Sequence, residues 1–121
     1  RFTGAVNAVG DSLPLEAVLA IARSVAGHTG RLVGASAPWL VAHGVGYWAG
    51  ERSLPLWLPD DVPGFATRAN GTYRILGGRH RPLEDVLQRV LADERERGLD
   101  RPRSAGLTRA DERELLDALA Q

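Results

Sequence analysis

The chain has 121 residues, of which 44% are hydrophobic and 25% charged, a composition that fits one globular domain with a core of its own. Its fifteen basic and fifteen acidic residues cancel, which argues against a nucleic-acid-binding protein held by general phosphate attraction. The absence of cysteine excludes disulfides and favours a cytoplasmic location, and no apolar run reaches the about 20 residues of a membrane helix. The chain contains no lysine, and all fifteen basic residues are Arg. A mechanism that needs a lysine amine therefore cannot be completed within this chain.

The first half of the chain predicts two strands and two helices. Residues 2–9 carry apolar and small side chains at alternate positions, which predicts a strand. Because this strand begins without a preceding cap or turn, we expect the chain to be a fragment of a longer protein. Pro14 then starts a helix over 14–26. A second short strand is predicted at 31–36, and a short helix at 37–43.

The second half predicts one more strand and three helices. After a turn at 60–64, residues 65–68 are expected to form a third strand, and Asn70 is expected to cap a short helix that ends at residue 76. Pro82 starts the clearest helix, which carries one apolar stripe and ends at residue 97. Thr108 and Asp111 form a capping box for the last helix.

These elements predict an α+β fold with a small mixed sheet of about three strands and four to five helices. We expect one domain over residues 1–121, divided into a core (1–98), a polar linker (99–106) and a C-terminal helix (107–121).

Residues 44–59 combine aromatic side chains with Pro and Gly and follow neither helical nor strand periodicity. Such a segment can form the wall of an apolar small-molecule pocket, because the rings supply contact area while Pro and Gly fix the backbone. The alternative is that Tyr47, Trp48 and Trp57 form the core of a small domain.

A second candidate is His80, which lies between Arg79 and Arg81. It could bind an anionic group together with these arginines; the alternative is a solvated extended segment. Arg68 and Arg74 add to this run of basic residues, which contains no acidic residue. The three histidines lack the spacing of a metal site, and the sequence contains no nucleophile elbow.

Several motifs resemble the C-terminal part of NAD-dependent epimerase/dehydratase-like proteins, which are extended or atypical short-chain dehydrogenase/reductases. The most specific are S-L-P-L-W-L-P at 53–59 and R-P-L-E at 81–84, with N-A-V-G at 7–10 in support. The resemblance covers nearly the whole chain. It departs from the family pattern at Ala69, where relatives often carry Asp, and at Gly78, where they carry Leu.

The resemblance implies the substrate-binding lobe of an NAD(P)-dependent oxidoreductase or epimerase. The family's cofactor-binding Rossmann domain and its Tyr-x-x-x-Lys pair are missing from the sequence, so this chain alone is expected to be non-catalytic. NAD or NADP would be bound by a Rossmann domain in cis or in trans. No catalytic, cofactor-binding or metal-ligating residue is expected here; the expected substrate-binding residues are Tyr47, Trp48, Leu54, Trp57, His80 and Arg81.

Two other functions stay open. The chain could be a free-standing, non-catalytic module that binds a small molecule, or an interaction domain whose apolar segment contacts a protein, for example a second copy of itself. Neither nucleic acid nor a membrane is expected as a partner.

Overall fold

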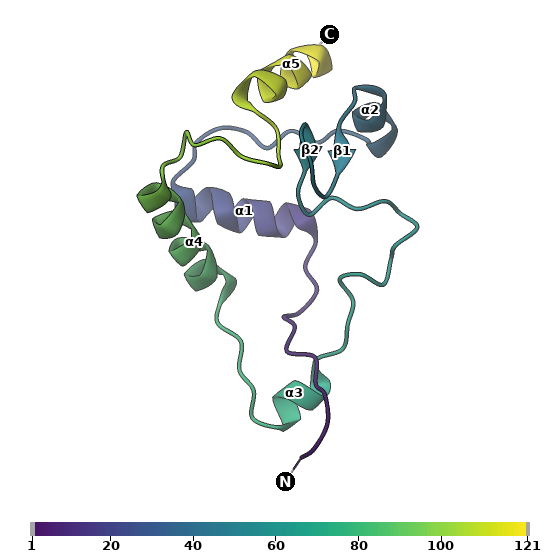
Figure 1. Cartoon of the computed structure of the whole chain (residues 1–121), viewed down its shortest axis with the longest axis vertical. Coiled ribbons are helices and arrows are strands. Elements are labelled where there is room, and N and C mark those ends of the chain that lie inside the picture. Colours follow the sequence, from purple (N-terminus) through teal and green to yellow (C-terminus); the bar gives the residue numbers. More distant parts are fainter. Residues whose placement is uncertain (1, 121) are drawn as a thin grey trace. The chain divides into compact units, whose positions relative to one another are not determined.

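The computed structural model describes residues 2–120, which contain five helices and two parallel strands (Figure 1). The chain divides into two compact units, each built from two separate segments. Unit 1 comprises Arg1–His28 and Asp60–Glu96, and unit 2 comprises Thr29–Pro59 and Arg97–Gln121. The predicted combination of helices with a small sheet is confirmed. No helix within residues 2–120 combines the length and the apolar character needed to cross a membrane.

Unit 2 contains the sheet. Helix α2 (Ala37–Ala42) begins at Ser36, whose hydroxyl accepts a hydrogen bond from the Trp39 backbone N–H. The chain then forms strand β1 (Gly46–Tyr47) and strand β2 (Ser53–Leu54), which pair in parallel with Gly46 opposite Ser53. In Figure 1 the two strands lie side by side, next to α2.

The connection between β1 and β2 is far shorter than the crossover that normally joins parallel strands. It turns sharply because Trp48, Gly50 and Arg52 have left-handed backbone angles, with φ of 62°, 90° and 50°. Backbone hydrogen bonds hold this turn at both ends, from Gly46 N to the Arg52 oxygen (2.9 Å) and from Trp48 N to the Trp57 oxygen (3.1 Å).

The buried residues of the described chain all lie in unit 2. Leu40, Val45 and Leu115 form the core, and Ser53 is the one buried polar residue among residues 2–120. Helix α5 (Arg109–Leu119) contributes Leu115 and is held to the β1–β2 connection by Arg52, which forms ion pairs with Asp111 (2.6 Å) and Glu114 (2.9 Å). Partly buried apolar residues surround this core: Ala35, Trp39, Leu54, Trp57 and Leu107.

Unit 1 contains the remaining helices, α1 (Leu15–Ala26), α3 (Gly71–Ile75) and α4 (Leu83–Arg97), of which α4 extends one residue beyond the unit. No described residue of unit 1 is buried, and neither α1 nor α4 packs extensively against another described helix. Their apolar stripes are therefore left partly exposed to solvent.

The predicted helices are confirmed to within one or two residues at each end, including the Thr108–Asp111 capping box. Asn70 does precede α3, but its side chain makes no capping bond. It donates instead to the Val9 oxygen and to Asp11, both at 3.0 Å. A residue that the sequence predicts as a local cap thus connects two distant segments.

The predicted strands at 2–9, 31–36 and 65–68 are wrong. No strand is formed there, and the sheet lies within the segment for which no regular structure was expected. The N-terminal segment, residues 2–12, does meet residues 65–69, through side-chain donors that bind backbone oxygens: Asn7 donates to Ala69 (3.4 Å) and Ser12 donates to Ala66. No backbone hydrogen bond joins them within residues 2–120, so alternating side chains alone did not produce a strand.

Candidate functional site

The structure places the six predicted substrate-binding residues in different units. Tyr47, Trp48, Leu54 and Trp57 lie in unit 2, and His80 and Arg81 lie in unit 1.

In unit 2 the aromatic segment packs mainly on its own core. The rings of Tyr47 and Trp57 are tilted against each other with their centroids 4.0 Å apart, and Leu54 and Trp57 contact the buried cluster. A second pair, Trp39 and His43, stacks at 3.8 Å. Leu54 and Trp57 therefore contribute to the packing around the core of unit 2.

Trp48 differs from these neighbours because its side chain is exposed and its backbone is left-handed. Leu56, also exposed with a φ of 73°, is the second such residue in the segment. Non-glycine residues in this region cost about 1–3 kcal/mol each, and such strain persists only where the surrounding structure enforces it. Substrate binding by Tyr47, Trp48, Leu54 and Trp57 stays a prediction.

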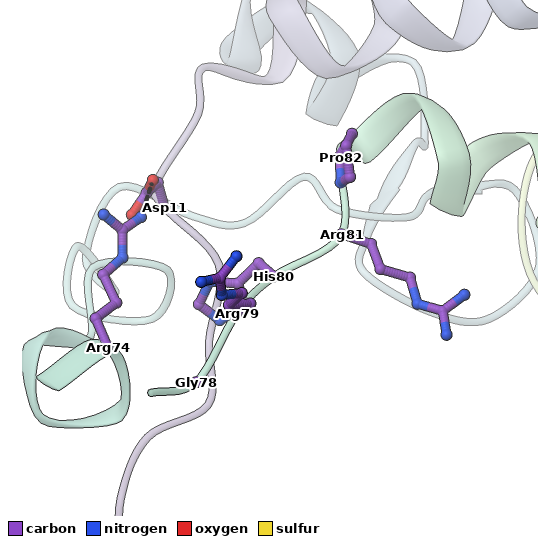
Figure 2. Close-up of a pocket in the computed structure, with 7 residues that line it drawn as sticks. All are labelled: Asp11, Arg74, Gly78, Arg79, His80, Arg81 and Pro82. Atoms are coloured by element: carbon purple, nitrogen blue, oxygen red, sulfur yellow. Dashed lines mark hydrogen bonds and ion pairs between the residues drawn. The ribbon is translucent and has the colours of Figure 1, made fainter. Parts of the chain in front are cut away.

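Unit 1 contains a hollow of about 580 Å³, lined by residues from the N-terminal segment, α3 and the segment that leads into α4. Figure 2 shows its lining: Asp11, Arg74, Gly78, Arg79, His80, Arg81 and Pro82. Both residues predicted for this region, His80 and Arg81, belong to it. Its volume lies within the range of small-molecule pockets.

Asp11 and Arg74 form one side of the hollow. Arg74 Nη2 lies 2.6 Å from Asp11 Oδ2, and Asn70 donates to the other carboxylate oxygen. The hydrogen bond from Asn70 and the charge of Arg74 hold the pKa of Asp11 below its ordinary value. The carboxylate is therefore ionised at neutral pH and balances the charge of Arg74.

Tyr73 fixes the backbone of the lining residues that follow α3. Helix α3 ends in a Schellman motif, in which Gly77 has a left-handed φ of 87° and the Gly78 N–H donates to the Tyr73 oxygen at 2.9 Å. The Tyr73 ring lies so close to Gly78 that a Cβ there would be 2.5 Å from the ring. Any residue other than glycine at position 78 would therefore require the Tyr73 ring to move.

The same tyrosine also positions the next two residues. Its hydroxyl donates to the Arg79 oxygen at 3.2 Å, and its ring lies 4.8 Å from the His80 ring, centroid to centroid. Pro82 then leads into α4. The backbone of residues 78–82 is thus held by a ring contact, a hydroxyl and a proline, without a strand or a helix.

The side chains differ in direction. Figure 2 shows Arg74 pointing toward Asp11, with Arg79 and His80 lying beside each other, whereas the guanidinium of Arg81 extends away from this group. No ion pair is formed by Arg79 or Arg81 within residues 2–120. Asp11 is the one acidic residue in the lining, so the hollow carries an excess of positive charge.

Sequence reasoning missed Asp11 and did not assign Arg74 to the site. The run of basic residues without an intervening acid was the available signal for Arg74. Asp11 is separated from Arg74 by 63 positions and gave no such signal.

The geometry suits binding of an anion. Guanidinium groups donate to carboxylates and phosphates in a fixed fork geometry. In the part of the chain that the structure describes, no group of three or more His, Cys, Asp or Glu side chains is arranged to hold a metal ion.

Comparison of the chain with protein-family models, with curated proteins and with solved structures finds no match.

Proposed function

We propose that the chain is the substrate-binding part of an NAD(P)-dependent oxidoreductase or epimerase of the short-chain dehydrogenase/reductase type. In this proposal the substrate binds to this chain, and a Rossmann domain, in cis or in trans, binds the cofactor and carries the catalytic Tyr and Lys. The resemblance of residues 53–59 and 81–84 to that family gives the proposal its chemistry.

The observation that carries the proposal is the missing core of unit 1. Helices α1 and α4 are amphipathic, yet Leu15, Leu19, Val86 and Val90 are all exposed. An apolar stripe stabilises a helix only when another surface covers it. Unit 1 therefore has the character of a part that packs against a further domain.

Surface area supports the same conclusion without reference to how the two units are placed. The chain exposes 9501 Å². Two separate compact domains, each of half its 13.0 kDa, would together expose about 7,700 Å². The excess of about 1,800 Å² is comparable to what one partner contributes to an obligate interface.

Calorimetry with NAD⁺ and NADP⁺ tests this division of labour. We expect no binding at micromolar concentration by this chain alone, because it lacks the glycine-rich turn that holds a dinucleotide. The complete product of the reading frame, or the chain combined with its cofactor subunit, should bind one of the two. Submicromolar binding by this chain alone would overturn the proposal.

A second measurement tests the predicted contact. Backbone amides of α1 and α4 should exchange with solvent more slowly once the cofactor domain is present, whereas those of α5 should change little. Unchanged exchange in α1 and α4 would mean that the cofactor domain does not cover them.

A second candidate function is a binding module without catalysis. It is favoured by the position of the hollow, whose lining lies entirely within unit 1 and needs no residue of another domain. The reading frame distinguishes the two candidates: a complete gene that encodes no Rossmann domain, with no subunit that supplies one, would leave the module.

A further inference from the structure

The hollow of unit 1 concentrates positive charge on a chain whose formal net charge is zero. Asp11 and Arg74 neutralise each other across a 2.6 Å ion pair. Arg79 has no ion-pair partner within residues 2–120, and His80 lies beside it (Figure 2). A cation that the fold leaves uncompensated next to a concave surface is a site for an anionic group.

The backbone around this charge is fixed before any ligand binds. Tyr73 holds the Arg79 carbonyl through its hydroxyl and contacts the His80 ring, and Gly78 fits directly against the Tyr73 ring. A ligand therefore has to order little more than the Arg79 side chain, which reduces the entropy cost of binding.

The start of α4 adds to the positive electrostatic potential of the hollow. Pro82, in the lining, accepts the first backbone hydrogen bond of the helix, from Val86 N. The N–H groups of the preceding turn consequently have no helical acceptor, and the positive end of the helix dipole lies beside the hollow. The carboxylates of Glu84 and Asp85 in this turn oppose the attraction but are solvent-exposed, where their charge is strongly screened.

We propose that this hollow binds the phosphate group of a phosphorylated small molecule, with Arg79 as the main contact and His80 and Arg74 beside it. A phosphate group fits the fork of a guanidinium and carries more charge than a carboxylate, so it gains more from an excess of cations. The hollow of about 580 Å³ exceeds the size of phosphate itself and leaves room for the rest of a substrate. This inference rests on the proposed substrate-binding role and names the class of substrate.

Titration of the chain with inorganic phosphate, followed by backbone amide NMR at constant ionic strength, tests the proposal. Amide signals of Gly78, Arg79 and Leu83 should shift and saturate. Glycerol 3-phosphate should produce the same shifts at lower concentration if the remainder of the hollow contacts the substrate, and equal affinity for the two would limit the site to the phosphate group.

Arg89 provides a matched control, because it is exposed on α4 in the same unit and does not line the hollow. Arg79→Gln should weaken phosphate binding by about tenfold or more, whereas Arg89→Gln, which removes the same charge, should change it by about twofold or less. Unchanged signals from α3 would show that each variant keeps its fold.

Shifts that do not saturate, or an equal loss of binding in both variants, would mean that phosphate is attracted only by the general field, and the proposal would be wrong. The calorimetry with NAD⁺ and NADP⁺ tests a different claim from the phosphate titration, so the two results can be distinguished. Absence of phosphate binding leaves the division between substrate and cofactor domains in place, whereas tight NAD⁺ binding by this chain overturns that division without removing the phosphate site.

Discussion

Ser53 is fully buried, and its hydroxyl connects three parts of unit 2. It donates to the Gly50 oxygen at 2.7 Å and accepts from the Gly106 N–H at 3.1 Å. One side chain therefore holds both the strained β1–β2 connection and the segment before α5. That segment, predicted as a linker, pairs with Glu51 through a backbone bridge at Gly106.

Replacement of Ser53 by alanine should lower the free energy of unfolding by about 1–3 kcal/mol, because the Gly106 N–H and the Gly50 oxygen lose their partner inside the protein. Urea denaturation followed by tryptophan fluorescence measures this loss, since Trp39, Trp48 and Trp57 all lie in unit 2. Ser104→Ala, at an exposed position of the same unit, is the control. An effect no larger than that of the control would contradict the role of Ser53.

Asp111 gives unit 2 a dependence on pH. The Thr108 hydroxyl and backbone N–H donate to its carboxylate at 2.6 and 3.0 Å, and these bonds, together with Arg52, hold the pKa of Asp111 below its ordinary value. A carboxyl whose pKa is lower in the folded state stabilises the protein above the unfolded-state pKa, near pH 4, and loses this effect as the pH falls through the folded-state pKa.

Asp111→Asn should therefore lower the melting temperature of unit 2 at pH 7, and the gap between variant and wild type should narrow as the pH falls below about 4. Asp117→Asn removes the same charge from α5 without touching Thr108 or Arg52 and should have a smaller effect. A gap of constant size from pH 7 to pH 3 would exclude the proposed coupling.

At the scale of elements, the helices fall into two kinds. Helix α5 places Leu115 in the core of unit 2 and is tied to Arg52, so tertiary contacts hold it. Helices α1 and α4 have good local signals, such as Pro14 and Pro82 at their starts and left-handed Gly27 and Gly98 after their ends, but nothing buried. Their stability rests on local propensity and on whatever surface covers the apolar stripe.

Substitution of two valines, one in the core of unit 2 and one on α4, compares the contribution of burial in the two units. Val45→Ala, at a position only 4% exposed between α2 and β1, should cost about 2–3 kcal/mol in unfolding free energy through lost burial and a cavity. Val90→Ala removes the same atoms from α4 at a position 51% exposed. It should be neutral or stabilise by up to about 0.5 kcal/mol, because alanine has the higher helix propensity.

Denaturation followed by circular dichroism, which detects helices of both units, compares the two variants. A loss at Val90 as large as that at Val45 would show that α4 is packed in a core within this chain, and it would remove the main support for a covering domain.

At the scale of the whole molecule, one unit has a core and the other has the hollow. The predicted site residues divide in the same way: the aromatic group lies on the core of unit 2, and His80 and Arg81 line the hollow of unit 1. If a further domain covers α1 and α4, it brings a second surface to the unit that contains the hollow. In the proposed function, the cofactor would be bound at this second surface.

The sequence by itself determined the helices, because their signals are local: prolines at the starts, glycines at the ends and the capping box of Thr108 with Asp111 act within a few residues. It also indicated the positive charge near His80. The tertiary structure alone decided the strands and the composition of the site. A strand exists only with a partner. Residues 2–12 and 65–69 form side-chain contacts in place of a backbone ladder, whereas 46–47 and 53–54 are joined by a left-handed turn that periodicity does not reveal. The ion pair between Asp11 and Arg74 also depends on the tertiary structure, because the two residues are 63 positions apart and meet only when their segments fold together.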